Sequence, residues 1–267
     1  MSSIHADEVQ RFLAIMNQLA DLSAKEIEPF FRGKLSVENK KLKRIYDPVT
    51  VADRNAEQVI REYLAEHLPS HAIIGEEFGT QEKSSDYCWV IDPIDGTRAF
   101  IMGSPLWGTL IGLNYHDEPI MGLMNQPFTK ERFWASPQGA FARWEGYEGP
   151  IETRQTTTLD SAIITSTCPD LFATQNDFQA FEKLRNHCQM TRYGGDCYSY
   201  CLLAMGSIDL VVESGLQSYD IAPLVPIVRQ AGGVISNWQG GNPGLGGQII
   251  AAATQELHAK AIDILTS

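Results

Sequence analysis

The pattern of apolar segments changes near the middle of this 267-residue chain, at about residues 146–150. Before that point, two stretches with helical spacing are followed by short apolar runs that predict consecutive, mainly antiparallel strands. The helical stretches are 5–32 and 53–67, and the predicted strands are 72–75, 87–92, 107–115, 119–126 and 131–135. After that point strands and helices alternate, with strands expected at 162–166, 208–213, 233–236 and 248–252 and helices at 177–188, 196–205, 220–231 and 255–265. An α+β part thus precedes an α/β part, and we expect a single domain over 1–267 with two lobes, about 1–146 and about 151–267.

Composition excludes several classes of protein. With 43% hydrophobic and 20% charged residues, the chain is neither disordered nor fibrous. No run of 18 apolar residues predicts a transmembrane helix, and the first ten residues, which include Asp7 and Glu8, lack the apolar core of a secretory signal. The five cysteines are an odd number without a CxxC pair, so we expect reduced core cysteines and a cytoplasmic location.

Charge also limits the partners. The chain has 33 acidic against 21 basic residues, a formal net charge of −12, which disfavours binding to nucleic acid or to anionic membranes. The exception is a basic segment over 34–44, with Lys34, Lys40, Lys41, Lys43 and Arg44. It is interpreted either as a solvated loop or as an arm that attracts an anionic substrate.

The stretch 89–97 (WVIDPIDGT) is the most informative for function, because an apolar strand leads directly into two carboxylates. We expect Asp92 to be the last strand residue, since Pro93 cannot donate to a sheet ladder. Asp95 can then turn back toward Asp92, and Gly96 permits a tight bend before Thr97 opens a helix. Carboxylates beside a helix N-terminus suit hard cations together with a phosphate. The alternative is a capped turn in which Asp95 accepts local backbone hydrogen bonds.

Three other acidic positions also lie at the ends of predicted elements. Glu76 follows the apolar strand that ends near Gly75, Asp53 lies at the start of a helix, and so does Asp220. Each has an ordinary interpretation, such as a helix N-cap for Asp53. Together with Asp92 and Asp95 they predict convergence on a site for more than one Mg²⁺ ion.

The chain resembles the inositol monophosphatase family of magnesium-dependent phosphomonoesterases over about residues 5–265. The resemblance rests on the motifs Gly75-Glu76-Glu77, Asp92-Pro93-Ile94-Asp95-Gly96-Thr97, and Asp220-Ile221-Ala222 with Ala231-Gly232-Gly233. Tyr219 stands where the family commonly has Trp, and Pro223 where Ala is common; neither change removes a ligand. The resemblance implies a layered αβαβα sandwich and a homodimer.

The resemblance also implies roles for individual residues. Asp92 would bridge two Mg²⁺ ions, Glu76 and the Ile94 carbonyl would complete the first site, and Asp95 and Asp220 the second. A third, looser ion would lie near Glu76, with Asp53 in its outer shell.

The same resemblance implies a hydrolysis by water. Thr97 would hydrogen-bond the attacking water with Asp53 behind it, and the backbone N–H groups of Gly96 and Thr97 would hold the phosphate. No Ser-His-Asp or Cys-His set is required, and the DxD arrangement of phosphatases with an Asp nucleophile is absent at this strand end.

Three further segments, 98–109, 192–198 and 213–220, resemble the histidinol-phosphate phosphatase branch of the family. Histidinol phosphate carries an ammonium group and an imidazole, so Asp196 and Glu213 would favour it over a neutral polyol phosphate. Arg98 and Arg192 would pair with the phosphate or orient those acids. Asp196 can also be interpreted as a helix N-cap and Glu213 as a solvated strand end, and polyol-specific relatives can carry an acid at the latter position.

We therefore expect a Mg²⁺-dependent histidinol-phosphatase, with two or three ions in its active site. The alternatives are an inositol-1-phosphate or broad sugar-phosphate phosphatase and, in a different class, a non-catalytic regulatory protein of the same fold. The presence of Asp53, Glu76, Asp92, Asp95, Thr97 and Asp220 favours an enzyme.

Overall fold

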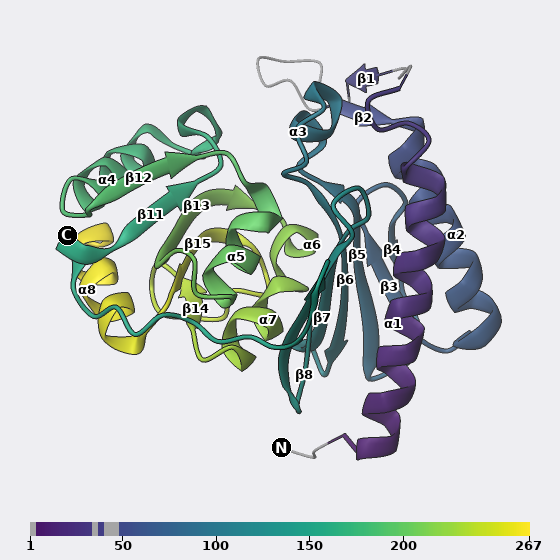
Figure 1. Cartoon of the computed structure of the whole chain (residues 1–267). Coiled ribbons are helices and arrows are strands. Elements are labelled where there is room, and N and C mark those ends of the chain that lie inside the picture. The colour runs from purple at the N-terminus through teal and green to yellow at the C-terminus, as the bar shows by residue number, and fades with distance from the viewer. Residues whose placement is uncertain (1–3, 34–36, 40–47) are drawn as a thin grey trace.

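Five layers of secondary structure lie side by side in the computed structural model of the chain (Figure 1). The structure describes residues 4–33, 37–39 and 48–267. The basic segment predicted over 34–44 therefore lies outside the described residues, except for the backbone of 37–39.

The first three layers are a helix pair, a large sheet and a group of three helices. The outer pair is α1 (Ala6–Ile27) and α2 (Val51–His67), and the inner helices are α5 (Asp196–Ala204), α6 (Ser218–Ile221) and α7 (Leu224–Gln230). The eight-stranded sheet between them has the order β10-β9-β8-β7-β6-β5-β3-β4. In chain order its strands are β3 (Ala72–Gly75), β4 (Gly79–Gln81), β5 (Tyr87–Asp95), β6 (Gly108–Tyr115), β7 (Glu118–Gln126), β8 (Glu131–Ser136), β9 (Gly139–Trp144) and β10 (Tyr147–Pro150).

A smaller sheet and two helices complete the stack. The five-stranded sheet has the order β12-β11-β13-β15-β14, and α4 (Gln175–Arg185) and α8 (Gln255–Leu265) cover its outer face (Figure 1). Its strands are β11 (Ile163–Ser166), β12 (Met190–Tyr193), β13 (Leu210–Leu216), β14 (Val234–Asn237) and β15 (Gly247–Ala252). Short elements outside the layers are β1 (Val37–Asn39) paired with β2 (Pro48–Thr50), the helix α3 (Thr97–Met102), and the 3-10 turns η1 (Leu159–Ser161) and η2 (Pro169–Leu171). The architecture is the predicted αβαβα sandwich.

Buried apolar clusters fill the interfaces between the layers. Met16 and Trp89 are fully buried between α1 and the large sheet, Leu224 and Phe133 between the two sheets, and Phe181 beneath α4. Burying side chains of this size stabilises the fold by roughly 1.5–3 kcal/mol each. The central cluster contains residues from both sheets, so the sheets share one hydrophobic core.

Two helix boundaries differ from the predicted ones because of proline. Helix α1 ends at Ile27 instead of near residue 32, because Pro29 has no N–H for the helical ladder. The single helix predicted over 220–231 is two helices, α6 and α7, with Pro223 between them. A Cβ at Gly122 would lie 1.7 Å from the Pro223 carbonyl oxygen, so the bare Gly122 backbone lets α7 pack directly on β7.

Every strand predicted from the sequence is present in the structure, but other strands were missed. Strands β4, β9, β10 and β12 were not predicted, and β3 runs parallel to β5, whereas the other neighbours in the large sheet are antiparallel. The large sheet ends within the predicted boundary at about 146–150, where β9 and β10 form a hairpin around Gly146, whose φ is +83°. Among the described residues, no helix has the length and apolar character needed to cross a bilayer.

Candidate active site

The end of strand β5 is bent by a β-bulge that positions two carboxylates. Asp92 pairs with Leu110 and Asp95 pairs with Gly108, so Pro93 and Ile94 together face the single residue Thr109. The prediction that the sheet ends at Pro93 was therefore wrong. The bulge takes Pro93 out of the ladder, where its missing N–H costs no hydrogen bond, and the Thr109 hydroxyl donates to the Pro93 carbonyl at 2.8 Å.

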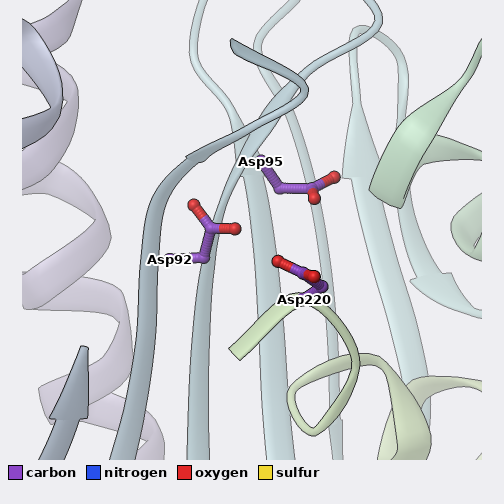
Figure 2. A group of neighbouring side chains, drawn as sticks. All are labelled: Asp92, Asp95 and Asp220. Carbon is purple, nitrogen blue, oxygen red and sulfur yellow. The ribbon is translucent and has the colours of Figure 1, made fainter. Parts of the chain in front are cut away.

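Asp92, Asp95 and Asp220 converge on one point between the two sheets (Figure 2). One carboxylate oxygen from each lies within 4.8 Å of the others. Each side chain is oriented by a backbone N–H: Ile94 donates to Asp92 at 3.1 Å, Cys197 to Asp95 at 2.6 Å and Gln217 to Asp220 at 2.7 Å. Three elements distant in sequence, β5, α5 and the first turn of α6, thus hold the cluster.

Burial opposes the negative charge of this cluster. Burial raises the pKa of Asp92 and of Asp95 well above the usual range, and neighbouring carboxylates raise both further. Burial is likewise the largest cause that raises the pKa of Asp220. Glu76 extends the cluster, because its side chain hydrogen-bonds Asp92 and its charge raises the pKa of Asp92. Buried acids of one sign are stable in ionised form only with a compensating cation.

The donor set fits a hard divalent cation. All the side-chain donors are carboxylate oxygens, which Mg²⁺ and Ca²⁺ prefer. Asp53 adds a second observation: within the described part of the chain its Oδ1 atom is buried and has no hydrogen-bond partner. A buried carboxylate oxygen without a donor is the kind of group that a cation or its water ligands satisfy.

Asp53 is the third residue of α2 and not its N-cap. The N-cap is Thr50, whose backbone N–H donates to Asp53 Oδ2 at 2.9 Å and whose hydroxyl accepts from the backbone N–H of Ala52 at 3.1 Å. Burial raises the pKa of Asp53 to about 6 against the lowering effect of the Thr50 hydrogen bonds, and the charge of Glu76 raises it further. The structure therefore brings Asp53 beside Glu76.

Among the described residues, no direct hydrogen bond joins Thr97 to Asp53. The Thr97 hydroxyl instead donates to the Ile94 carbonyl at 3.0 Å. Thr97 opens α3 directly after Gly96, whose φ is +84°, a left-handed conformation that favours glycine. Both residues line the cavity together with Ile94.

The carboxylates open into a cavity of about 460 Å³ that is lined by both acidic and apolar residues. Besides the cluster, its charged lining residues include Asp196 and Glu213, with Arg98 close enough to affect the pKa of Asp196. The lining also includes Leu216 and Tyr219 from the segment 213–220, and four residues that the sequence did not indicate, namely Cys168, Leu171, Phe172 and Ala173. A cavity of this volume accommodates a small organic molecule.

Asp196 is the first residue of α5 and has a left-handed backbone conformation, with φ +44°. Its interpretation as an N-cap was wrong, because Gly195 is the N-cap. Burial raises the pKa of Asp196 to about 7, the charge of Glu213 raises it further, and Arg98 opposes both. A Cβ at Gly96 would lie 3.2 Å from Asp196 Cβ, so the missing side chain of Gly96 leaves room for this acid beside the turn at Gly96 and Thr97.

Glu213 is buried in the middle of β13, so its interpretation as a solvated strand end was wrong. Thr167 donates to its Oε1 through the backbone N–H at 3.0 Å and through the hydroxyl, and Tyr200 donates to Oε2 at 2.9 Å. The sequence offered no signal for Thr167 or Tyr200, because β11 and α5 are distant from β13 in the chain. Arg192 lies exposed on β12 and is not one of the described residues that line the cavity.

Comparison with known proteins agrees with this fold and site. A protein of Arabidopsis thaliana named bifunctional phosphatase IMPL2, chloroplastic, is 40% identical over 275 residues, covering 99% of this chain and 78% of that protein. A histidinol-phosphatase of Chlorobaculum parvum is 30% identical over 251 residues, covering 94% of this chain and 95% of its own length. A solved structure described as an inositol monophosphatase from Zymomonas mobilis has a TM-score of 0.85 at 39% identity, covering 99% of this chain and 100% of that one.

The layered fold, the acidic cavity and these relatives define a phosphatase that acts on small phosphate esters. The sequence model of the inositol monophosphatase family matches residues 8–267, so the chain belongs to that family. The resemblance found in the sequence motifs is thereby confirmed, including its relation to histidinol-phosphatases.

Proposed function

We propose that this protein is a Mg²⁺-dependent histidinol-phosphatase, which hydrolyses L-histidinol phosphate to L-histidinol and phosphate in histidine biosynthesis. One observation carries the proposal: a single cavity joins the carboxylate cluster of Asp92, Asp95 and Asp220 to a second acidic pair, Asp196 and Glu213. The carboxylate cluster suits cations that bind the phosphate group, and the acidic pair suits a substrate whose alcohol part is positively charged. The names of curated relatives support the same substrate.

Glu76, Asp92, Asp95, Asp220 and the Ile94 carbonyl would hold two or three Mg²⁺ ions. When bound, Mg²⁺ would neutralise the charge of the phosphate and lower the pKa of the attacking water. Burial and neighbouring carboxylates raise the pKa values of Asp92 and Asp95, and no positive side chain of the described residues is among the causes, which supports carboxylates available to a cation.

The chain's own polar groups would orient the reactants. The Thr97 hydroxyl lies on the cavity wall, where it donates to the Ile94 carbonyl. Its oxygen would form a hydrogen bond with the attacking water. Asp53, beside Glu76, would hold further water through its unpaired Oδ1 atom. Gly96 and Thr97 lie at the N-terminus of α3, where backbone N–H groups have no acceptor within the helix. These two N–H groups would donate hydrogen bonds to the phosphate.

Asp196 and Glu213 would recognise the ammonium or imidazolium group of the substrate. A hydrogen bond to a charged group is worth roughly 1.5–3 kcal/mol, so two such contacts would separate a cationic substrate from a neutral one. Arg98 lies next to both the phosphate-binding turn and Asp196, where it would pair with the phosphate or orient the acid. Arg192 is not among the described residues that line the cavity, so we assign it no role in substrate binding by its own subunit.

The second candidate function is an inositol-1-phosphate or broad sugar-phosphate phosphatase. It is favoured by the hydrogen bonds of Glu213: Thr167 and Tyr200 already donate to both of its oxygens, which leaves less capacity for a substrate ammonium group. The relative from Zymomonas mobilis is described as an inositol monophosphatase. A non-catalytic regulatory protein is the third possibility, and the complete acidic cluster disfavours it.

A panel of phosphate esters at fixed Mg²⁺ concentration tests the proposal. Phosphate release from histidinol phosphate, inositol 1-phosphate and glycerol phosphate would be compared as kcat/KM. The proposal expects the highest value for histidinol phosphate. A higher value for inositol 1-phosphate would reject the substrate assignment while leaving the phosphatase assignment intact.

We also propose a homodimer of single two-lobed domains in the cytoplasm. The location is supported by the cysteines, since all five are unpaired, as is usual in a reducing compartment. The dimer is inferred from the family resemblance, and size-exclusion chromatography with light scattering would test it.

A further inference from the structure

Glu76 lies on the turn between β3 and β4, which is the least supported part of the proposed metal site. Asp92 and Asp95 lie within the ladder of β5, and Asp220 belongs to a helical capping box. By contrast, β4 is a three-residue edge strand whose residues are all exposed. Short exposed edges open readily in folded proteins, so a ligand on this turn needs an additional anchor.

Glu57 supplies that anchor from inside helix α2. Its side chain is completely buried, and both of its oxygens accept hydrogen bonds from the turn. The backbone N–H of Glu77 donates to Oε2 at 2.7 Å, and that of Phe78 donates to Oε1 at 3.2 Å. The two residues that follow Glu76 are therefore fixed by one carboxylate.

Arg61, one helical turn further along α2, completes the arrangement. Its Nε atom donates to Glu57 Oε1 at 2.7 Å, and its guanidinium group also donates to the Gly79 carbonyl. Glu57 and Arg61 thus hold the turn at two places: Glu57 accepts from the N–H groups of Glu77 and Phe78, and Arg61 donates to the carbonyl of Gly79, where β4 begins. The ion pair also compensates the buried charge of Glu57, without which that charge would be costly.

Gly75 leaves the space that this carboxylate occupies. A Cβ at Gly75 would lie 2.0 Å from Glu57 Oε1 and 2.8 Å from a terminal nitrogen of Arg61. No side chain fits there while Glu57 is in place, so the strand end immediately before Glu76 is built around the Glu57 carboxylate. On the other side of Glu76, its own backbone N–H donates to the Ile91 carbonyl of β5 at 3.2 Å.

We propose that Glu57 is a positioning residue for metal binding, which holds the β3–β4 turn so that Glu76 faces Asp92. This inference rests on the proposed function, because Glu76 must be a metal ligand. Glu57 is completely buried and is not one of the cavity-lining residues, so it would touch neither substrate nor ion. It acts by keeping the Glu76 carboxylate in place before an ion arrives, as outer-shell partners of metal ligands commonly do.

The test is Mg²⁺ binding by the metal-free protein carrying Glu57→Gln, measured by isothermal titration calorimetry. The amide of Gln keeps the shape of the side chain, but its NH₂ group cannot accept the hydrogen bonds that Arg61 and the backbone N–H groups of Glu77 and Phe78 donate to the carboxylate. The expected result is Mg²⁺ affinity about 10- to 100-fold weaker than in the wild type. Hydrolysis of histidinol phosphate would require more Mg²⁺ for half-maximal rate and would recover when Mg²⁺ is raised.

Two control variants separate positioning from general effects. Glu62→Gln removes the same charge from an exposed position of α2, where the side chain accepts a hydrogen bond from Gln58. Ile60→Val loosens the buried face of the same helix without touching the turn. Both should keep the wild-type Mg²⁺ affinity, and Ile60→Val should do so despite a lower unfolding temperature.

If Glu57→Gln does not fold, Arg61→Lys provides the same information. A lysine cannot donate to Glu57 and to the Gly79 carbonyl with the geometry of a guanidinium group, so Mg²⁺ affinity should fall in the same direction by a smaller factor. Wild-type affinity in whichever of the two variants folds would overturn the inference. Wild-type protein that releases no phosphate from any ester with Mg²⁺ would instead refute the proposed function, which is a different outcome.

Discussion

The backbone N–H of Cys197 donates to Asp95 Oδ2 across 2.6 Å, although the two residues are 102 positions apart in the sequence. This hydrogen bond joins the first turn of α5 to the bulged end of β5. It orients a carboxylate from the large sheet with a helix that packs between both sheets. The acidic cluster is therefore formed only when the two halves of the chain are packed together.

Replacement of Asp95 by Asn should leave a folded protein with activity lowered at least ~10³-fold, the scale of losing strong electrostatic stabilisation of a transition state. The amide removes one negative charge from the cluster and keeps its shape. Steady-state phosphate release and circular dichroism would check this result. The control is Asp86→Asn, an exposed acid that pairs with His116 far from the cluster. Near-normal activity in the Asp95 variant would show that Asp95 holds no metal.

The stability of the metal-free protein should fall as pH rises from about 4 to about 7. Burial raises the pKa of Asp53 from 3.8 to about 6 and the pKa of Asp196 and of Asp220 to about 7. A group with a raised pKa in the folded state binds its proton more tightly there than in the unfolded chain. Its contribution to stability is thus complete below about pH 4 and is lost as pH rises through the folded pKa.

Mg²⁺ should reverse this loss, because the ion binds the ionised carboxylates. Thermal unfolding with and without Mg²⁺ at pH 5 and pH 8 would measure the effect. The stabilisation by Mg²⁺ should be larger at pH 8, and the apparent Mg²⁺ affinity should rise with pH. A stabilisation that is equal at both pH values would contradict proton–metal competition in the cluster.

Asp196→Asn should weaken the selection of a cationic substrate. Losing one charged hydrogen bond, roughly 1.5–3 kcal/mol, corresponds to a rise of at least about tenfold in KM for histidinol phosphate. For glycerol phosphate, which has no cation, KM should change little. The ratio of the two KM values is the informative quantity, since a general distortion of the cavity would raise both.

Gly122→Ala should destabilise the fold without any change of charge or polarity. The added Cβ would lie 1.7 Å from the Pro223 carbonyl oxygen, so α7 must move away from β7. Overpacking of this kind typically costs about 1–3 kcal/mol, and urea unfolding would measure it. Gly146→Ala is not a matched control because of its positive φ, whereas Ala142→Gly removes a methyl group from a buried position of β9, which β8 separates from β7.

The acidic cluster was predictable where its residues are adjacent in the sequence. In the stretch 89–97, an apolar strand, a proline, a glycine and two acids occur together, and each has a local consequence. The bulge was not predictable, because it depends on Thr109 of the neighbouring strand. The short strands β4 and β12 were missed for a related reason, since pairing with a neighbour and not their own sequence makes them strands.

Residues outside the motifs were harder to interpret. Glu57 reads as an ordinary charged residue of an amphipathic helix, and only its contacts with Glu77 and Phe78 show that it is buried beneath the turn. Glu213 reads as a polar strand end, and only Thr167 and Tyr200 show that it is enclosed. In both cases the deciding partners come from another element, so no local pattern could identify them.

The central claim is that a buried carboxylate cluster holds divalent cations for the hydrolysis of a phosphate ester. Phosphate release from histidinol phosphate, measured on chelator-treated protein as Mg²⁺ is added back, tests it most directly. The account predicts no turnover without metal, full recovery with Mg²⁺, and no recovery in the Asp95→Asn variant at the same Mg²⁺ concentrations. Turnover that persists in the metal-free protein, or that the Asp95 variant recovers in full, would contradict it.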